Sequence, residues 1–163
     1  MTLLDTLGIT TISVEKNRVE MRMPVRPEIY QPHGFLHGGA TIALLESCAS
    51  RAAEELTDFD KELIFGLETT IRHKKARQDG IITGVAELER EEPSYGGRKQ
   101  FWHVIATDEL GDTISEGTFI TKIVTKEHFA EKQRKPVSYT HLDVYKRQLR
   151  DRIRTYQAAK VGL

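Results

Sequence analysis

Residues 31–50 bring together groups that could act on a carbonyl carbon. Gln31 and His37 are followed by the pair Gly38-Gly39, and Glu46 lies in the apolar stretch behind them. Glycines at the start of a helix leave backbone N–H groups free to bind an oxygen that gains negative charge. A carboxylate can act as a base or as a nucleophile. Taken alone, the glycine pair is explained equally well as the start of a helix that lies close to its sheet.

The surroundings of Glu46 on a helix set its expected reactivity. Glu46 shares a helical face with Ile42, Ala49, Ser50 and Ala53. Burial among small apolar residues disfavours a charged carboxylate, so we expect Glu46 to be more basic and more reactive than an ordinary glutamate. A solvated position, which is usual for a helical glutamate, is the alternative.

The spacing of these groups predicts that one chain does not complete the site. Eight residues separate Gly38 from Glu46, and on one helix this corresponds to about 12 Å of rise. The amide and the carboxylate are therefore too far apart to meet at one carbonyl. A two-fold homodimer with antiparallel helices would bring Gly38 of one protomer towards Glu46 of the other and create two equivalent sites.

The pattern of apolar residues predicts the elements that must position these groups. Alternating apolar and polar residues indicate strands, and a long proline-free stretch rich in Ala, Leu and Glu indicates one helix. Prolines 24, 27 and 32 exclude regular structure from the connection before that helix. Strands joined by short turns are expected to be antiparallel neighbours, so the last four strands should form a meander. We therefore predict an α+β fold in which an antiparallel β-sheet is wrapped around one long central α-helix. The expected strands are 9–14, 19–23, 63–72, 81–92, 98–107 and 113–124, and the helix is 39–56.

Length and charge divide the chain into a body and a tail. A chain of 163 residues is the size of one domain and is long enough for a sizeable core. Residues 1–125 carry 14 Lys and Arg against 20 Asp and Glu, whereas residues 126–163 carry 10 against 4. A basic tail can bind nucleic acid or a membrane, but this one shows no aromatic-interleaved motif and no clear amphipathic period, and we expect an exposed basic C-terminal appendage. Within it, residues 136–148 resemble translated adaptor sequence and are set aside as non-native.

Other classes of site are not indicated. Cys48 is the one cysteine of the chain, which excludes an intramolecular disulfide, fits a reducing compartment and suggests a small buried residue. The histidines at 33, 103, 128 and 141 show no metal-ligand spacing with one another or with Cys48. No phosphate-loop or dinucleotide-binding glycine signature and no membrane-spanning or targeting stretch is present. We expect a cytoplasmic protein with no metal, no cofactor, no nucleic-acid partner and no membrane partner.

The ordered set of Gln31, His37-Gly38-Gly39-Ala40, Glu46 and Ser50 resembles the motif of the hotdog-fold acyl-CoA thioesterases. The branch of this family that the motif resembles contains the phenylacetate-pathway, 4-hydroxybenzoyl-CoA and 1,4-dihydroxy-2-naphthoyl-CoA thioesterases. The resemblance covers about residues 3–125 and implies a hotdog thioesterase domain over residues 1–125. It also implies hydrolysis of an aromatic or medium-chain acyl-CoA to a free acid and coenzyme A. Further similar strings are Gly66-Leu67-Glu68, His73, Gly80 and Gly97-Arg98-Lys99-Gln100-Phe101-Trp102.

The same resemblance implies roles for individual residues. Gln31 and His37 would help to hold the thioester oxygen, and Gly38 would donate its backbone N–H to it. Glu46 would act as nucleophile or general base, and Ser50 would orient the water or the carboxylate. A small residue at a helix contact is the alternative for Ser50. Since this family forms its active sites at dimer interfaces and often assembles as tetramers, the resemblance implies a homodimer here, and further a homotetramer.

Two basic clusters are candidates for binding the phosphates of coenzyme A. The first is Arg72-His73-Lys74-Lys75-Ala76-Arg77, in which His73 and Lys75 are the chosen candidates, and the second is Gly97, Arg98 and Lys99. Both are expected at strand ends or turns, and the family resemblance falls directly on His73. A solvated strand edge protected by lysines is the alternative for the first cluster.

Two other functions compete with this one. Hotdog dehydratases share the expected fold, but their pattern around the histidine differs. A non-catalytic acyl-CoA-binding regulatory or scaffold protein would keep the fold without hydrolysis. The joint presence of His37, Gly38 and Glu46 argues against that alternative.

Overall fold

The computed structural model describes residues 1–134 of the chain. Residues 136–148, which resemble adaptor sequence, lie outside the described residues, and their foreign origin stays a prediction. A boundary between two units of the chain falls between Phe129 and Ala130, while the predicted division at residue 125 stays a prediction. The elements in chain order are α1 (Leu3–Leu7), β1 (Thr10–Glu15), β2 (Arg18–Pro24), the 3-10 turn η1 (Pro27–Ile29), α2 (Gly38–Glu54), β3 (Glu62–His73), β4 (Ile81–Ser94), β5 (Gly97–Thr107), β6 (Thr113–Thr125) and α3 (Lys126–Arg134).

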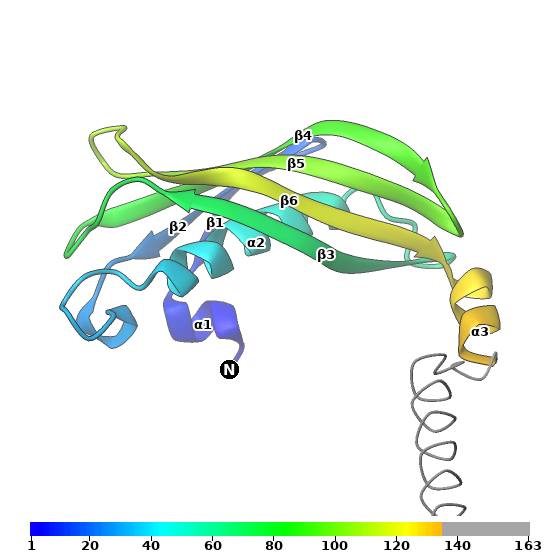
Figure 1. Cartoon of the computed structure of the whole chain (residues 1–163), viewed down its shortest axis with the longest axis horizontal. Helices are drawn as coiled ribbons and strands as arrows, with labels where there is room; N and C mark the ends of the chain where they lie inside the picture. The colour runs from blue at the N-terminus through cyan, green and yellow to red at the C-terminus, as the bar shows by residue number, and fades with distance from the viewer. Residues whose placement is uncertain (135–163) are drawn as a thin grey trace, which may run out of the picture. The chain divides into compact units, whose positions relative to one another are not determined.

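Six strands among residues 1–134 form one antiparallel sheet in the order β1-β2-β4-β5-β6-β3. The sheet is curved, and α2 lies against its concave side (Figure 1). The buried face of α2 is mostly alanine and leucine, which allows a close approach to the sheet. At β4 the approach depends on Gly84, because a Cβ there would lie 2.8 Å from Leu44 Cγ. The predicted α+β arrangement, an antiparallel sheet wrapped around one central helix, is confirmed.

The predicted four-strand meander is wrong in one connection. β4, β5 and β6 are neighbours as expected, but β3 pairs with β6 at one edge of the sheet and β4 pairs with β2. After β3, Lys74 and Lys75 both donate their N–H groups to the carbonyl of Ile114, at 2.8 and 3.2 Å. The chain thus crosses the ends of β6 and β5 before β4 begins, where the Gly80 carbonyl accepts from Val25 N–H at 2.9 Å. Residues 78–80 correctly indicated a turn between β3 and β4. Turn-forming residues do not, however, determine which strand pairs with β3.

Three short helical segments were not predicted. In α1, Thr2 Oγ1 accepts from Asp5 N–H at 3.2 Å and the Asp5 carboxylate accepts from Thr2 N–H at 2.7 Å. This capping box starts the helix, and Gly8, with φ 68°, ends it. η1 lies in the proline-rich connection where no regular structure was expected; Pro27 suits its first position because φ is already helical. α3 follows β6. The bounds of the predicted strands and helix agree with the structure to within two residues.

No helix within residues 1–134 has both the length and the apolar character needed to cross a bilayer. The cytoplasmic location stays a prediction.

Candidate functional site

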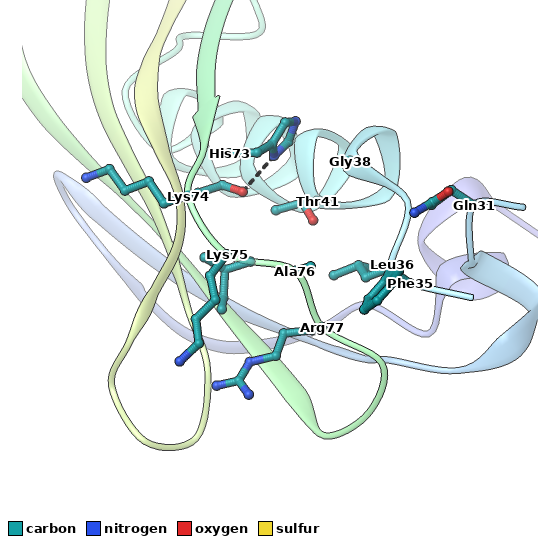
Figure 2. Close-up of a pocket in the computed structure, with 12 residues that line it drawn as sticks. Gln31, Phe35, Leu36, Gly38, Thr41, His73, Lys74, Lys75, Ala76 and Arg77 are labelled. Atoms are coloured by element: carbon teal, nitrogen blue, oxygen red, sulfur yellow. Dashed lines mark hydrogen bonds between the residues drawn. The ribbon is translucent and has the colours of Figure 1, made fainter. Parts of the chain in front are cut away.

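The N-terminus of α2 opens into a pocket of about 400 Å³. Gly38 and Thr41 of α2, Gln31 of the preceding loop and His73 at the end of β3 are among its lining residues (Figure 2). The His73 ring lies against Gly38, since a Cβ there would be only 2.8 Å from His73 Nε2. On its other side the ring is held by Ser115, whose Oγ is 2.8 Å from Nδ1 and which is fully buried. The pocket therefore brings together four of the predicted site residues, namely Gln31, Gly38, His73 and Lys75.

His37 caps the N-terminus of α2 and hydrogen-bonds to the backbone N–H of only one of the two glycines that follow it. Its Nδ1 accepts a hydrogen bond from Gly39 N–H at 2.9 Å. A neutral His37 that accepts at Nδ1 carries its proton on Nε2, where it can donate. Within residues 1–134, no acceptor stands opposite the N–H of Gly38. Of the glycine pair, Gly38 is therefore the one with an N–H available to an incoming oxygen.

Gln31 is held in a tight loop before the helix. Its N–H donates to the carbonyl of Phe35 at 2.8 Å, and its side-chain Oε1 accepts from His33 N–H at 3.1 Å. The loop is tied to the β3–β4 connection by Leu36 N–H, which donates to the Arg77 carbonyl at 2.7 Å. Because Oε1 is already an acceptor within the loop, the amide NH2 of Gln31 is the group left to donate into the pocket.

Glu46 and Ser50 line a different pocket, of about 460 Å³. Glu46 is exposed and Ser50 is half-buried, so the burial predicted for Glu46 is absent in the single chain. Glu46 lies outside the buried face of α2, which includes its neighbours Leu45 and Ala49. Its carboxylate is close to β3, because a Cβ at Gly66 would lie 3.7 Å from Glu46 Oε1. The lining residues of this pocket are Leu3, Leu4, Thr11, Met21, Ala43, Glu46, Ser47, Ser50, Arg51 and Glu54.

The candidate catalytic residues do not converge within one chain. The two pockets share no lining residue. Gly38 and Glu46 both belong to the continuous helix α2, so about 12 Å of helical rise separates them. One chain therefore places the Gly38 N–H and the Glu46 carboxylate on two separate surfaces, a candidate oxygen-binding half and a candidate carboxylate half.

The first basic cluster is balanced by acids of the β5–β6 turn. Lys75 pairs with Asp112 and lies 3.8 Å from Asp108, and Arg77 pairs with Asp108. The hydrogen bond from Lys75 lowers the pKa of Asp112 below its ordinary value. Lys75 and Arg77 extend away from Gly38 (Figure 2). A phosphate at this cluster would have to compete with these carboxylates.

The second cluster lies at the opposite end of β6. His73 pairs with Ser115 near the beginning of that strand, whereas Gly97 pairs with Val124 near its end. The structure does not bring the two clusters together within one chain.

Arg98, in the second cluster, is fully engaged with its own chain. It forms ion pairs with Glu62 and Glu91 and donates to the carbonyl of Leu56 at 2.7 Å. The hydrogen bond from Arg98 lowers the pKa of Glu62. These contacts favour a structural role for Arg98 over phosphate binding, and a phosphate-binding role for this cluster stays a prediction.

Sequence reasoning missed three neighbours of the candidate residues. Ser115 orients the His73 ring, Gly66 leaves room beside Glu46, and α1 forms a wall of the Glu46 pocket. The capping-box spacing of Thr2 and Asp5 was a signal for α1. Ser115 and Gly66 depend on the pairing of β3 with β6, for which the sequence holds no local signal.

No group of three or more His, Cys, Asp or Glu residues within residues 1–134 is arranged to hold a metal ion. That the protein works without metal or cofactor stays a prediction.

Comparison with protein-family models gives a match to the thioesterase superfamily over residues 33–114. The chain is 37% identical over 109 residues to a 1,4-dihydroxy-2-naphthoyl-CoA hydrolase of Listeria monocytogenes, covering 67% of this chain and 85% of that protein. It is 36% identical over 111 residues to the proofreading thioesterase EntH of Cronobacter turicensis, covering 68% of this chain and 77% of that protein.

Solved structures give the same result. A thioesterase of Staphylococcus aureus, crystallised as a variant in which a glutamine is replaced by alanine, superimposes with a TM-score of 0.70 at 30% identity. The superposition covers 75% of this chain and 98% of the other. The likeness therefore extends over nearly the whole of that enzyme.

Proposed function

We propose that this chain, which belongs to the thioesterase superfamily and so hydrolyses thioesters, acts on an acyl-CoA. The proposed acyl group is aromatic or of medium chain length. The products are the free acid and coenzyme A. One observation carries this proposal: α2 presents an unoccupied Gly38 N–H at its N-terminus and the carboxylate of Glu46 two turns later. The similarity to a protein named as a CoA hydrolase supports the choice of coenzyme A.

In the proposed reaction, the thioester oxygen binds at Gly38. The backbone N–H and the positive end of the helix dipole stabilise the negative charge that this oxygen gains. The amide NH2 of Gln31 and the Nε2–H of His37 are further donors. These groups polarise the carbonyl before the carbon is attacked.

Glu46 acts on the carbonyl carbon in one of two ways. Its carboxylate attacks the carbon to form an anhydride that water then hydrolyses, or it removes a proton from a water molecule that attacks directly. In both cases the C–S bond breaks, the thiolate of coenzyme A leaves and takes up a proton, and water supplies the new oxygen of the acid. Ser50, one turn from Glu46, orients the water or the carboxylate.

The proposal requires a homodimer, and the free edge of β3 is the surface that fits it. β3 has 12 residues, and no strand within residues 1–134 covers its outer edge. Phe65 and Leu67 are exposed on it, at 41% and 52%. A long strand edge with exposed apolar residues favours pairing with another chain. We infer that two copies pair antiparallel along β3, and assembly into a homotetramer is proposed from family resemblance alone.

The geometry of β3 makes this pairing productive. Glu46 lies beside Gly66, and Gly38 lies beside His73 of the same strand. A two-fold axis near residues 69–70 would set Gly66 of one protomer opposite the partner's His73. The same operation brings the carboxylate half of each chain to the oxygen-binding half of the other. It also brings the Glu62 end of one β3, with the second basic cluster, towards the first basic cluster of the partner.

The first test measures release of free thiol from benzoyl-CoA and octanoyl-CoA. Replacing a catalytic acid or base costs about 10²–10⁴-fold in rate, so Glu46→Ala should lose at least about a hundredfold. The control is Glu89→Ala, which removes an exposed glutamate on β4 and should retain full activity. Equal activity in Glu46→Ala and the wild type would refute the assigned role. Binding of acyl-CoA by the wild type without thiol release would instead favour the non-catalytic alternative.

The second test asks whether each site is shared between chains. Glu46→Ala and Gln31→Ala are unfolded together, refolded together and assayed. Half of the dimers formed at random are mixed, and each mixed dimer has one site with both wild-type residues, so about a quarter of wild-type activity should return. Sites built within one chain would give no recovery beyond the average of the two variants refolded separately.

A further inference from the structure

The pocket that contains Glu46 is lined by residues of α1 and α2 and of the strands β1 and β2. It contains about 460 Å³ and is open to solvent, which is within the range of pockets that hold drug-sized ligands. Its apolar wall is formed by Leu3 and Leu4 of α1, Met21 of β2 and Ala43 of α2. The chemistry of the wall suits an apolar group.

The position of Glu46 limits what can occupy this pocket. If Glu46 acts on a thioester carbon, that carbon lies next to the carboxylate, with the sulfur on one side and the acyl group on the other. Coenzyme A is large and charged and is expected towards the basic clusters, which line other surfaces. The acyl group is therefore the part of the substrate that matches the apolar wall.

Small side chains on α2 leave the space for this group. Ala43, Ser47 and Ser50 lie on the pocket side of the helix. Ser47 Oγ donates to the carbonyl of Ala43 at 2.7 Å, which satisfies its hydroxyl proton within the helix. Arg51, which is paired with Glu54 and Glu55 at 3.3 and 2.6 Å, also lines the pocket.

α1 is attached to the domain by few contacts. It has five residues, none of them buried, and Leu3 is 59% exposed. Leu4 packs partly against the core, and its carbonyl accepts from Ile9 N–H at 2.9 Å. Arg26 donates to the carbonyl of Thr6. Because Leu3 is largely exposed, its side chain can be exchanged with little effect on the core.

We propose that α1 forms the wall of the acyl subsite, and that Leu3 and Leu4 select the size of the acyl group. This inference rests on the proposed function, because it takes the position of the acyl group from the role of Glu46. It assigns substrate selection to a short N-terminal helix outside the motif of residues 31–50.

The test compares variants of α1 across acetyl-CoA, benzoyl-CoA, octanoyl-CoA and palmitoyl-CoA. The Leu3→Ala/Leu4→Ala variant enlarges the subsite and should favour longer acyl groups. The kcat/KM for palmitoyl-CoA, divided by that for benzoyl-CoA, should therefore rise by roughly tenfold. This is the size of effect that one or a few methylene groups have in an apolar pocket. Leu3→Trp, at an exposed position that tolerates a larger side chain, should lower the ratio of octanoyl-CoA to acetyl-CoA. Leu110→Ala, at an 83% exposed residue of the β5–β6 turn, is the matched control and should keep the wild-type ratios.

Binding separates this inference from the proposed function. Thioether analogues of the same four esters cannot be hydrolysed, and their Kd values report the acyl subsite without catalysis. The Kd ratios should change in the same direction as the kcat/KM ratios. Unchanged ratios in both α1 variants would overturn the inference even where Glu46→Ala abolishes hydrolysis. Loss of the proposed function alone would appear as wild-type protein that binds the analogues but releases no thiol.

Discussion

Substitution of Gly38 by alanine tests the contact between Gly38 and His73, on which the shape of the pocket at the N-terminus of α2 depends. The new Cβ would lie 2.8 Å from His73 Nε2, whereas ordinary contacts begin at 3.4 Å. Gly38 does not have a positive φ, so alanine fits the backbone and the clash is confined to the His73 ring. The ring must move by about 0.6 Å, the difference between the two distances.

The cost follows from what holds the ring. A shift of this size strains or breaks the bond between His73 Nδ1 and Ser115 Oγ, now 2.8 Å. Losing such a bond costs about 0.5–1.5 kcal/mol, and an off-rotamer side chain costs a similar amount. Replacing glycine by alanine also stabilises the folded protein by about 0.4–1 kcal/mol, because it lowers the conformational entropy of the unfolded chain. Gly38→Ala should therefore lower the free energy of unfolding by about 1 kcal/mol.

A double-mutant cycle isolates the contact. Free energies of unfolding are measured in urea, at one protein concentration, for Gly38→Ala, His73→Ala and the double variant. Without the His73 ring the clash is absent, so Gly38→Ala should become neutral or stabilising in that background, with a coupling of roughly 1–2 kcal/mol. An equal cost of Gly38→Ala with and without His73 would show that the ring does not rest on Gly38 and would refute the described pocket.

Two further predictions concern stability and the free thiol. Because Arg98 holds the pKa of Glu62 below its ordinary value of 4.5, the stabilisation from this pair is complete above about pH 4.5 and is lost as the pH falls through the lower folded value. Glu62→Gln should lower Tm at pH 7 and should lose less further stability than the wild type between about pH 5 and 3; parallel curves of Tm against pH would contradict this. Burial raises the pKa of Cys48 to about 12, and Cys48 is fully buried. The folded protein should therefore not react with a chromogenic thiol reagent at pH 8 and should react once denatured, so the same reagent can report coenzyme A release without background; rapid labelling of the folded protein would contradict the burial.

The six described strands and the long helix α2 were predictable because each has a local signal. Alternation of apolar residues located all six described strands, and the proline-free stretch after His37 located α2. The hotdog fold and the thioesterase family, inferred from the motif of residues 31–50, are confirmed by the comparisons. These predictions succeeded because the period of a strand, the composition of a helix and a sequence motif can be recognised without knowledge of distant contacts.

The missed features depend on contacts between distant segments. The pairing of β3 with β6 is set by the whole sheet, and it positions Ser115 against His73 and Gly66 beside Glu46. Exposure of Glu46 depends on which side of α2 the sheet covers. A helical wheel gives the neighbours of a residue on its own helix but not what lies opposite it. The roles assigned to the individual site residues stay predictions.

The continuous helix α2 also constrains how this chain can change in length. Deletion of one residue between Gly38 and Glu46 would shift the glutamate into the position that Leu45 now occupies, which is a rotation of about 100° around the helix axis. That position is fully buried against the sheet, so the carboxylate would enter the core and leave its pocket. Insertions and deletions within this interval should therefore be excluded, although the β5–β6 turn, where Gly111 has open space around it, can accept them. In this sense the interval between the glycine and the acid is a fixed spacer, and its length matters as much as the residues at its ends.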